Sequence, residues 1–223
     1  MGRLSPPRRD ELLTAPGLAR FVTLEGGEGA GKSTQIAALA AALRDDGFDV
    51  VTTREPGGSA GAEAVRALLV EGGAERWSAP AELFLLLAAR LDHLERTIRP
   101  AVERGAVVLC DRFWDSTRVY QALVGGLDLA EVDALHARWL TPFRPALTLV
   151  LDLPAEVGLA RATHGRFEAK GGDFHARVRS GYLALAAAEP ARLRVVDAAR
   201  PAEAVTTDAL AAVRAHLAGE GTP

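Results

Sequence analysis

The chain has 223 residues, of which 48% are hydrophobic and 25% are charged. These proportions are typical of a soluble globular protein, and the length predicts one large domain or at most two. A net charge of -3 argues against a general nucleic-acid binder, which would be strongly basic. No uninterrupted apolar stretch is long enough to span a membrane, so we expect neither nucleic acid nor a membrane as a partner. The single cysteine, Cys110, excludes an internal disulfide and fits a reducing, cytoplasmic environment.

The two ends of the chain differ in composition from its centre. Residues 1–20 contain three prolines and four arginines and show no apolar periodic face. We therefore predict a flexible extension over residues 1–19, a single domain over residues 20–218, and a frayed tail over residues 219–223.

From residue 20 onward, strand-like and helix-like segments alternate. Strands are expected over residues 20–25, 49–53, 106–111, 146–152 and 193–197. Helices are expected over residues 32–46, 60–70, 81–103, 129–139, 155–162, 173–188 and 202–217. Several of the strands are nearly continuous runs of Val and Leu, which is typical of strands covered on both faces. The alternation predicts an α/β fold, a parallel five-stranded sheet with helices on both faces, with ligands at the carboxyl ends of its strands.

A phosphate-binding loop of the GxxxxGK[ST] type lies between the first strand and the first helix. It has the sequence Gly-Gly-Glu-Gly-Ala-Gly-Lys-Ser over residues 26–33. Glycines let backbone N–H groups turn toward phosphate oxygens, Lys32 can reach the β- and γ-phosphates, and the Ser33 hydroxyl can ligate Mg²⁺. The alternative is a glycine-rich turn that only joins strand to helix. It is less favoured because loop, lysine, hydroxyl, strand and helix agree, so the sequence predicts a protein that binds a nucleoside triphosphate.

Two further motifs follow the second and third strands. Thr-Arg-Glu-Pro-Gly-Gly occupies residues 53–58, and Asp-Arg-Phe-x-x-Ser-Thr-x-x-Tyr-Gln occupies residues 111–121. Together with Glu-Gly-x-Glu-Gly-x-Gly-Lys-Ser-Thr-Gln at residues 25–35, they resemble the motifs of bacterial thymidylate kinases. The resemblance runs from about residue 20 to the end of the chain, and three separated motifs in the same order make it specific. It implies a P-loop nucleoside monophosphate kinase that converts dTMP to dTDP with ATP and Mg²⁺, for dTTP synthesis.

The resemblance also implies which residues form the site. For ATP and its phosphates they are Gly26, Gly27, Glu28, Gly29, Ala30, Gly31, Lys32, Ser33 and Thr34. For dTMP they are Glu28, Arg54, Pro56, Leu86, Arg90, Arg112, Ser116, Thr117, Tyr120 and Gln121. The implied metal ligands are Ser33 and Asp111, and the implied catalytic residues are Lys32, Arg112, Arg166 and Arg161.

Two arginines stand at the ends of the second and third strands. A planar guanidinium binds phosphate oxygens in bidentate fashion, and the resemblance assigns both Arg54 and Arg112 to the acceptor phosphate. The alternative for either arginine is a surface ion pair with Glu55 or Asp115. We expect Asp111 to help hold Mg²⁺ or to orient Arg112, with a capping carboxylate as the alternative.

Recognition of the base and sugar is expected from the third helix and from residues 116–121. Arg90 lies in a helix otherwise rich in leucine and alanine, so its charge needs a partner. The resemblance gives it the thymine O4, and gives Thr117 and Gln121 the remaining pyrimidine edge. It places the Tyr120 ring beneath the sugar, with an ordinary half-buried tyrosine as the alternative. It places Glu28 near the acceptor sugar, with a solvated loop charge as the alternative.

One base-binding position departs from the family pattern. Relatives usually carry phenylalanine four residues before this arginine, where its ring stacks on thymine. Here that position is Leu86, and Phe84 lies on a different helical face. Leucine covers the ring but lacks the aromatic stacking contribution of ~0.5–1.5 kcal/mol, which predicts weaker acceptor binding or a looser base preference.

The lid is the second departure. We expect it over about residues 161–172, shorter than in many relatives. Bacterial relatives that have no arginine in the phosphate loop use a lid arginine to stabilise the transferring charge. Arg166 is therefore the leading candidate and Arg161 the runner-up, with contact to adenine or simple solvation as alternatives for Arg161.

The sequence leaves two alternative functions open, and the resemblance implies a homodimer. The nearest alternative is a kinase for another pyrimidine nucleoside monophosphate such as dUMP. An alternative of a different class is a non-catalytic nucleotide-binding regulatory protein, which would have no use for a second anion site. Relatives are commonly homodimers, and apolar helical surfaces at residues 83–94 and 127–139 are candidates for such an interface, although the same periodicity fits a core.

Overall fold

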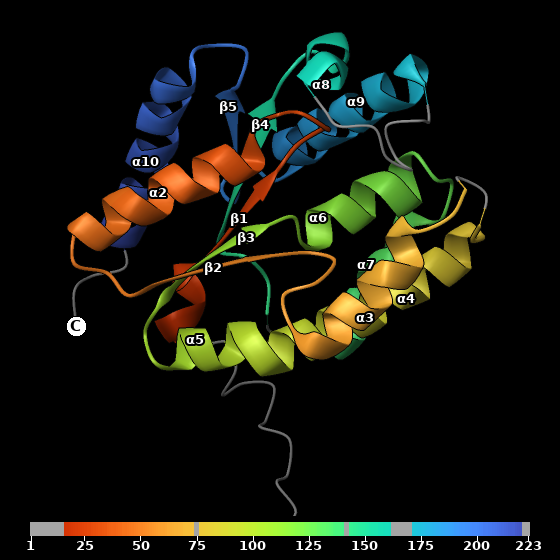
Figure 1. Ribbon diagram of the computed structural model, residues 1–223, viewed down its shortest axis with the longest axis horizontal. Helices are drawn as coiled ribbons and strands as arrows, with labels where there is room; N and C mark the ends of the chain where they lie inside the picture. Colours follow the sequence, from red (N-terminus) through yellow and green to blue (C-terminus); the bar gives the residue numbers. More distant parts are fainter. Residues whose placement is uncertain (1–15, 74–75, 141–142, 162–170, 220–223) are drawn as a thin grey trace, which may run out of the picture.

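A parallel, five-stranded sheet forms the centre of the molecule, in the order β2-β3-β1-β4-β5 (Figure 1). The computed structural model describes residues 16–73, 76–140, 143–161 and 171–219. The strands are β1 Phe21–Glu25, β2 Val50–Arg54, β3 Val107–Asp111, β4 Leu147–Asp152 and β5 Leu193–Asp197. Each predicted strand is confirmed, with every boundary within about one residue of its prediction. The predicted fold class is likewise confirmed.

Helices follow the strands in alternation, as predicted. They are α2 Lys32–Asp45, α3 Ala60–Val70, α4 Ala79–His93, α5 Arg99–Glu103, α6 Trp114–Thr117, α7 Leu129–Trp139, α8 Ala155–Arg161, α9 Gly172–Ala188 and α10 Ala202–Gly219. The π-helical segment η2 Leu94–Ile98 joins α4 to α5, so the helix predicted over residues 81–103 is continuous but changes its winding. Pro100 lies at the start of α5, directly after this change of winding, and it has no N–H to donate back into the preceding turn.

A helical segment that the sequence did not predict follows β3. It consists of α6 and the π-helical segment η3 Arg118–Leu123. The prediction failed because this segment has no polar face: Asp115, Thr117 and Gln121 are as buried as Val119. Without an apolar stripe opposite a polar one, the 3.6-residue periodicity that indicates a helix does not appear.

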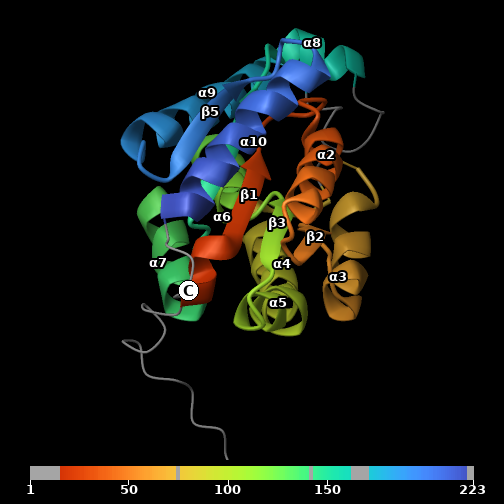
Figure 2. The same ribbon diagram turned by 90° about the vertical axis from the view of Figure 1, so that its left-hand side faces the viewer.

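The two faces of the sheet pack against different helices. Val22 and Leu24 face one side, where they pack against α2 and α10, which lie together over the sheet (Figures 1 and 2). Phe21, Val108 and Cys110 face the other side and pack against η2 and α5. Successive residues of a strand point to opposite faces, so nearly continuous apolar strands supply both cores. Cys110 is itself a buried free thiol within this second core.

The described part of the chain begins at residue 16, slightly before the predicted start of the domain at residue 20. A 3₁₀ turn, η1 Pro16–Arg20, precedes β1. Its Ala19 carbonyl lies 2.8 Å from His216 Nε2 of α10, and Arg20 donates a hydrogen bond to the Gly105 carbonyl. Residues 16–19, which were predicted to belong to the extension, therefore form a turn that contacts the domain. At the other end α10 extends to Gly219, and residues 1–15 and 220–223 lie outside the described part.

A helix that crosses a bilayer must be long and predominantly apolar. None of the helices in residues 16–73, 76–140, 143–161 and 171–219 combines the length and the apolar character that a membrane span needs.

Candidate active site

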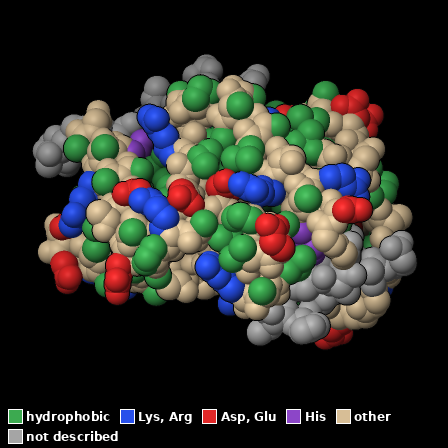
Figure 3. Space-filling model, turned by 90° about the horizontal axis from the view of Figure 1, so that it is seen from above, with side chains coloured by type: hydrophobic (Ala, Val, Ile, Leu, Met, Phe, Trp, Pro, Cys, Tyr) green, Lys and Arg blue, Asp and Glu red, His purple; other side chains and the backbone are tan. Residues whose placement is uncertain are grey.

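The motifs that follow β1, β2 and β3 meet at one cleft of about 930 Å³. This is near the upper end of the range of roughly 300–1,000 Å³ that is usual for small-molecule sites. The cleft lies at the carboxyl ends of the parallel strands, as expected for a sheet of this kind. Figure 3 views the molecule from above and shows basic and acidic side chains interspersed with apolar ones across that face.

The phosphate loop joins β1 to α2, and its glycines allow a backbone path closed to other residues. Gly29 has φ 68° and Gly31 has φ 88°, in the left-handed region that favours glycine. A Cβ on Gly29 would lie 2.0 Å from the carbonyl oxygen of Gly158 in α8. The loop is therefore packed directly against the backbone of α8, a contact that the sequence did not reveal.

Lys32 is positioned by the loop that it terminates. Its Nζ donates to the carbonyl oxygens of Gly26 at 3.2 Å and Gly27 at 2.9 Å. Burial and, after it, the positive charge of Arg112 lower the pKa of Lys32 to about 8. A bound polyphosphate would favour the ammonium form, so the side chain is placed to meet the anion of a nucleotide.

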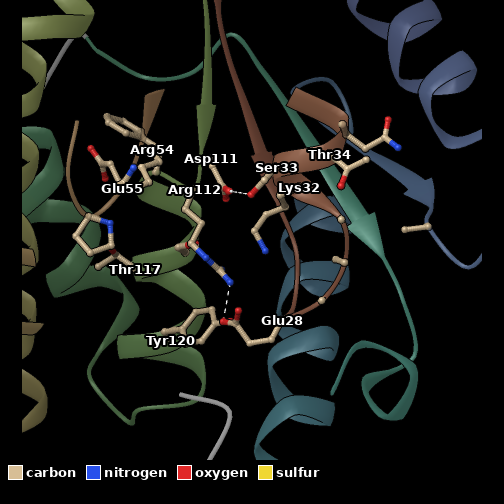
Figure 4. A pocket seen from close by; sticks show the side chains of 18 of the residues that line it. Glu28, Lys32, Ser33, Thr34, Arg54, Glu55, Asp111, Arg112, Thr117 and Tyr120 are labelled. Atoms are coloured by element: carbon tan, nitrogen blue, oxygen red, sulfur yellow. Dashed lines mark hydrogen bonds and ion pairs between the residues drawn. The ribbon is translucent and has the colours of Figure 1, made fainter. Parts of the chain in front are cut away.

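Ser33 and Asp111 face each other across the ends of α2 and β3. The Ser33 hydroxyl donates to Asp111 Oδ2 at 3.1 Å (Figure 4). Both groups offer oxygen ligands, which Mg²⁺ prefers, and Mg²⁺ is usually held by one or two carboxylates together with substrate phosphates. No cluster of three or more His, Cys, Asp or Glu in the described residues could hold a metal on its own. The site therefore fits a magnesium ion that arrives with a nucleotide.

Arg112 is held in a strained conformation that points it across the cleft. It has φ 66°, in the left-handed region that a non-glycine residue rarely adopts. Its Nη2 donates to Glu28 Oε1 of the phosphate loop at 2.7 Å (Figure 4), and its guanidinium lies 5.2 Å from the centre of the Tyr120 ring. The Tyr120 hydroxyl also donates to Glu28 Oε1, at 3.2 Å. The structure thus brings together three of the four residues that the resemblance assigned to the acceptor phosphate and sugar, Arg112, Glu28 and Tyr120.

The charge of Glu28 is maintained by these neighbours. Burial opposes its ionisation, but the positive charges of Arg112 and Lys32 outweigh burial and lower the pKa of Glu28. The side chain is therefore not the solvated loop charge of the alternative interpretation.

A buried carboxylate at the end of β1 supports the turn that carries Arg112. Glu25 Oε1 accepts from the backbone N–H groups of Phe113, at 2.8 Å, and Ser116, at 3.3 Å. Its Oε2 accepts from the Ser116 hydroxyl at 2.6 Å and from Tyr182 at 3.0 Å. Burial and then the negative charge of Asp115 raise the pKa of Glu25 to about 7. Ser116, predicted to bind dTMP, lines the cleft, but its hydroxyl is committed to Glu25.

Arg54 reaches the cleft beside the Arg112 turn. The register of β2 and β3 pairs Arg54 with Asp111, so the two arginines do stand at adjacent strand ends. Arg54 forms an ion pair with Glu63 at 3.0 Å, and its side chain is 53% exposed. The alternative interpretation, an ion pair between Arg54 and Glu55, is wrong, because Glu55 pairs with Arg90.

The other alternative partner, Asp115, is also wrong. It pairs with Arg192 at 2.7 Å and with Arg118 at 3.3 Å. Asp115 is fully buried, so this group of charges stabilises the structure beneath the cleft rather than at its surface.

Arg90 has partners within the protein, and they fix its orientation. Its Nε donates to Glu55 Oε2 at 2.6 Å, its Nη1 donates to Thr117 Oγ1 at 3.0 Å, and its Nη2 donates to the Phe113 carbonyl at 3.0 Å. His136 Nε2 lies 2.7 Å from Nη1, and since arginine can only donate, the imidazole accepts. Burial and then the positive charge of Arg90 lower the pKa of His136 to about 2. The prediction that Arg90 needs a partner is confirmed, and the first of those partners is Glu55.

The part of the cleft that the resemblance assigns to the base has an aliphatic lining at position 86. Leu86 lines the cleft. Phe84 is 59% exposed and does not line it, so Phe84 does not substitute for the missing aromatic side chain.

The lid is described only at its edges. Arg161, the last residue of α8, lines the cleft. Arg166 lies outside the described residues, as does most of the predicted lid.

Several residues that line the cleft were not predicted from the sequence. Arg66 of α3 lines the cleft and donates to the Pro56 carbonyl at 2.6 Å. The loop after β5 contributes Ala198 and Arg200 on the side of the phosphate loop. The rule that ligands lie at strand ends would have indicated this loop, because β5 ends at Asp197. No local pattern indicated Arg66, which points into the cleft from the middle of a helix.

The sequence and structure were compared with known proteins. A model of the family "Thymidylate kinase" matches residues 24–209. A thymidylate kinase of Caulobacter vibrioides is 57% identical over 190 residues, covering 83% of this chain and 91% of that protein. One from Ruegeria pomeroyi is 49% identical over 207 residues, covering 90% and 97% of the two chains. The crystal structure of thymidylate kinase from Ehrlichia chaffeensis superposes with a TM-score of 0.70 at 30% identity, covering 86% of this chain and 97% of that one.

The family match, over residues 24–209, includes most of the sheet, the phosphate loop and the two motifs that follow β2 and β3. Both the sequence and the architecture are thus shared over most of the length of these relatives. The chain belongs to the thymidylate kinase family.

Proposed function

We propose that the protein phosphorylates dTMP to dTDP with ATP as the phosphate donor, by direct in-line transfer. As a member of its family it is a nucleoside monophosphate kinase, a transferase of nucleotide biosynthesis. The observation that carries the proposal is the contact between Arg112 and Glu28 at 2.7 Å. The contact supports the proposal because an arginine, a side chain suited to bind an acceptor phosphate, lies against a loop of the type that binds donor phosphates.

Each end of the cleft has a separate task in this reaction. Backbone N–H groups of the phosphate loop and Lys32 bind the donor phosphates. Arg112 and Arg54 hold the acceptor phosphate and offset its charge. Phosphoryl transfer needs chiefly alignment and charge neutralisation. The acceptor is an already ionised phosphate oxygen, so no side chain acts as a strong base and no covalent enzyme intermediate is needed.

We further propose that Mg²⁺ is the cofactor and that Ser33 and Asp111 hold it. When bound, the ion supplies neutralisation of charge on the β- and γ-phosphate oxygens. Ser33 and Asp111 support this role because their oxygens are already 3.1 Å apart.

The acceptor base is proposed to lie between Leu86 and the wall formed by Arg90, Thr117 and Gln121. All four residues line the same cleft. Arg90 would donate to the thymine O4, and Tyr120 would pack against the sugar, where the residue lies beside Glu28. Pro56 lines the same side of the cleft.

A lid arginine is proposed to stabilise the charge that develops during transfer. Arg166 remains the leading candidate and Arg161 the runner-up. Substituting the arginine that acts in this way by alanine is expected to lower kcat far more than it raises KM, because the contact strengthens in the transition state.

A coupled assay of ADP formation tests the proposed function. Purified protein is supplied with ATP and Mg²⁺ and, in parallel, with dTMP, dUMP or dCMP. We expect dTMP to be the best acceptor. A preference for dUMP would favour the kinase for another pyrimidine monophosphate. Binding of ATP without any monophosphate-dependent ADP formation would favour the regulatory protein.

We also propose a homodimer located in the cytoplasm. Of the two helical surfaces considered for an interface, Leu83 and Val132 belong to the core. Phe84, at 59%, and Trp139, at 56%, are the most exposed large apolar side chains among the described residues, and both fall within those surfaces. Light scattering coupled to size exclusion measures the oligomeric state, and a monomer at micromolar concentration would contradict this assembly.

A further inference from the structure

A buried carboxylate lies behind the glutamine of the proposed base-binding wall. Gln121 Nε2 of η3 donates to Glu82 Oε1 of α4 at 2.8 Å. Glu82 is 7% exposed and Gln121 is 4% exposed, and both line the cleft. Neither the motifs nor the proposed reaction give Glu82 a role.

The chemistry of the two groups fixes the direction of the glutamine amide. A carboxylate can only accept hydrogen bonds, whereas an amide has a donating NH₂ group and an accepting oxygen. Gln121 must therefore turn its NH₂ group toward Glu82, and its Oε1 points away from that carboxylate. Within the described residues, Gln121 Oε1 receives no hydrogen bond from the protein, so it is available to accept one from a ligand.

Arg90 presents the opposite polarity in the same cleft. Its orientation is set by Glu55 at 2.6 Å, and a guanidinium can only donate. The wall therefore combines a fixed donor, Arg90, with a fixed acceptor, the carbonyl oxygen of Gln121.

One hydrogen-bond donor and one acceptor in the wall match only one type of pyrimidine edge. Thymine and uracil both offer an accepting O4 and a donating N3–H, whereas cytosine offers a donating N4 amine and an accepting N3. A donor at Arg90 and an acceptor at Gln121 complement the first pattern and oppose both atoms of the second. A buried polar group left facing a like group loses its hydrogen bond and is destabilised.

We propose that Glu82 is a positioning residue for base selection, which fixes the amide of Gln121 so that the cleft accepts thymine and rejects cytosine. The proposal rests on the placement of the acceptor base against Arg90 and Gln121 given above. Glu82 acts through Gln121 and contributes nothing to the distinction between thymine and uracil, which differ only in a methyl group.

The substitution Glu82→Gln tests the proposal. The new amide can offer either its oxygen or its NH₂ group to Gln121, so Gln121 can reverse its own amide at little cost. We expect the preference for dTMP over dCMP, as a ratio of kcat/KM, to fall by roughly tenfold. The preference for dTMP over dUMP should stay unchanged, because those two bases share the same hydrogen-bonding edge.

Two companion variants separate positioning from structure. Glu95→Gln makes the same change at an exposed position just beyond α4 and should alter neither ratio. Glu82→Asp keeps an acceptor-only group and should retain most of the discrimination against dCMP. If Glu82→Gln lowers activity toward dTMP, dUMP and dCMP in equal proportion, Glu82 is only a structural residue and the proposal is overturned.

A further variant covers the case in which Glu82→Gln does not fold. Gln121→Met removes the amide and keeps a similar shape, and it should lose the dCMP discrimination while it keeps the dTMP-to-dUMP ratio. An unchanged dCMP ratio in that variant would overturn the proposal as well. Failure of the wild-type protein to phosphorylate dTMP would instead contradict the proposed function, so the two failures can be told apart.

Discussion

The two ends of the cleft both contain arginines, but they balance the charge in different ways. At the phosphate end Arg112 and Glu28 have side-chain exposures of 16% and 20%, and Arg54 is 53% exposed. At the base end Arg90 and Glu55 are 2% and 4% exposed. The first set of charges can exchange protein partners for those of a ligand, whereas the second set is fixed inside the protein.

The difference fits what each end is proposed to recognise. A phosphate is an anion, so the groups that bind it must keep positive charge available. A pyrimidine is neutral, so it needs directed hydrogen bonds and no net charge, which would be costly to bury alone. Glu55 balances the positive charge of Arg90 and fixes the direction in which its guanidinium donates hydrogen bonds.

The largest expected effect comes from breaking the buried pair. Arg90→Met leaves Glu55 buried without its guanidinium, and loss of one partner of a buried ion pair costs about 3–5 kcal/mol of unfolding free energy. The double variant Arg90→Met/Glu55→Gln should recover part of that stability but not the preference for dTMP. Urea unfolding and the acceptor assay measure the two effects.

The matched control for this prediction is Arg54→Met, which breaks the exposed pair with Glu63. Its effect on stability should be below about 1 kcal/mol. Equal losses of stability in Arg90→Met and Arg54→Met would contradict the contrast between the two ends.

Substitutions at the phosphate end should lower kcat and leave the free energy of unfolding nearly unchanged. Lys32→Ala removes the ammonium that meets the donor phosphates, and loss of one group that stabilises transition-state charge typically costs about 10²–10³ in kcat. Its unfolding free energy should change little, because within the described residues Lys32 hydrogen-bonds only to loop carbonyls, at 2.9 and 3.2 Å. Arg96→Ala, at a side chain that is 75% exposed, serves as the control. A kcat close to that of the wild type would show that Lys32 is not at the reacting phosphate.

The base end should also give the protein a specific pH dependence. His136 has its pKa lowered from 6.5 to about 2 by burial and by Arg90, so below the unfolded value only the unfolded state takes up its proton. Stability contributed by His136 is present above pH 6.5 and is lost as the pH falls, with a slope that approaches about 1.4 kcal/mol per pH unit.

His136→Gln tests this dependence, because an amide oxygen can still accept from Arg90 but does not titrate. Between pH 7 and pH 5 its unfolding free energy should fall less steeply than that of the wild type. Parallel curves for the two proteins would rule out His136 as the source of the slope.

The smallest expected effect sharpens the base end further. Leu86→Phe adds the missing ring and should lower the KM for dTMP by the factor that ~0.5–1.5 kcal/mol allows, with kcat unchanged. Val195→Phe, which adds a ring at an exposed position of β5, should leave KM unchanged. The absence of any improvement in Leu86→Phe would mean that the base does not lie against residue 86.

The phosphate end could be predicted from the sequence much better than the base end. Lys32, Ser33 and their glycines are nearly consecutive, so a local pattern contains the whole phosphate loop. Arg54 and Arg112 could be placed because strand ends of a parallel sheet meet at one edge.

The contacts at the base end join residues that are distant along the chain. Glu55 lies 35 residues from Arg90, and Glu82 lies 39 residues from Gln121. No local periodicity contains such pairs, and the helical segment that carries Gln121 is buried on several sides, so it lacks the amphipathic pattern as well. The sequence therefore predicted that Arg90 needs a partner but not which residue it is.

The close approach of the phosphate loop to α8 narrows the residues that two positions can accept. A Cβ on Gly158 would lie 2.3 Å from the carbonyl oxygen of Glu28, although Gly158 has no proposed contact with either nucleotide. An alanine there would force the phosphate loop to shift and would move Glu28 relative to Arg112. The distance between the phosphate loop and Arg112 therefore depends on the absence of a side chain at position 158. Lack of space therefore restricts position 158 to glycine.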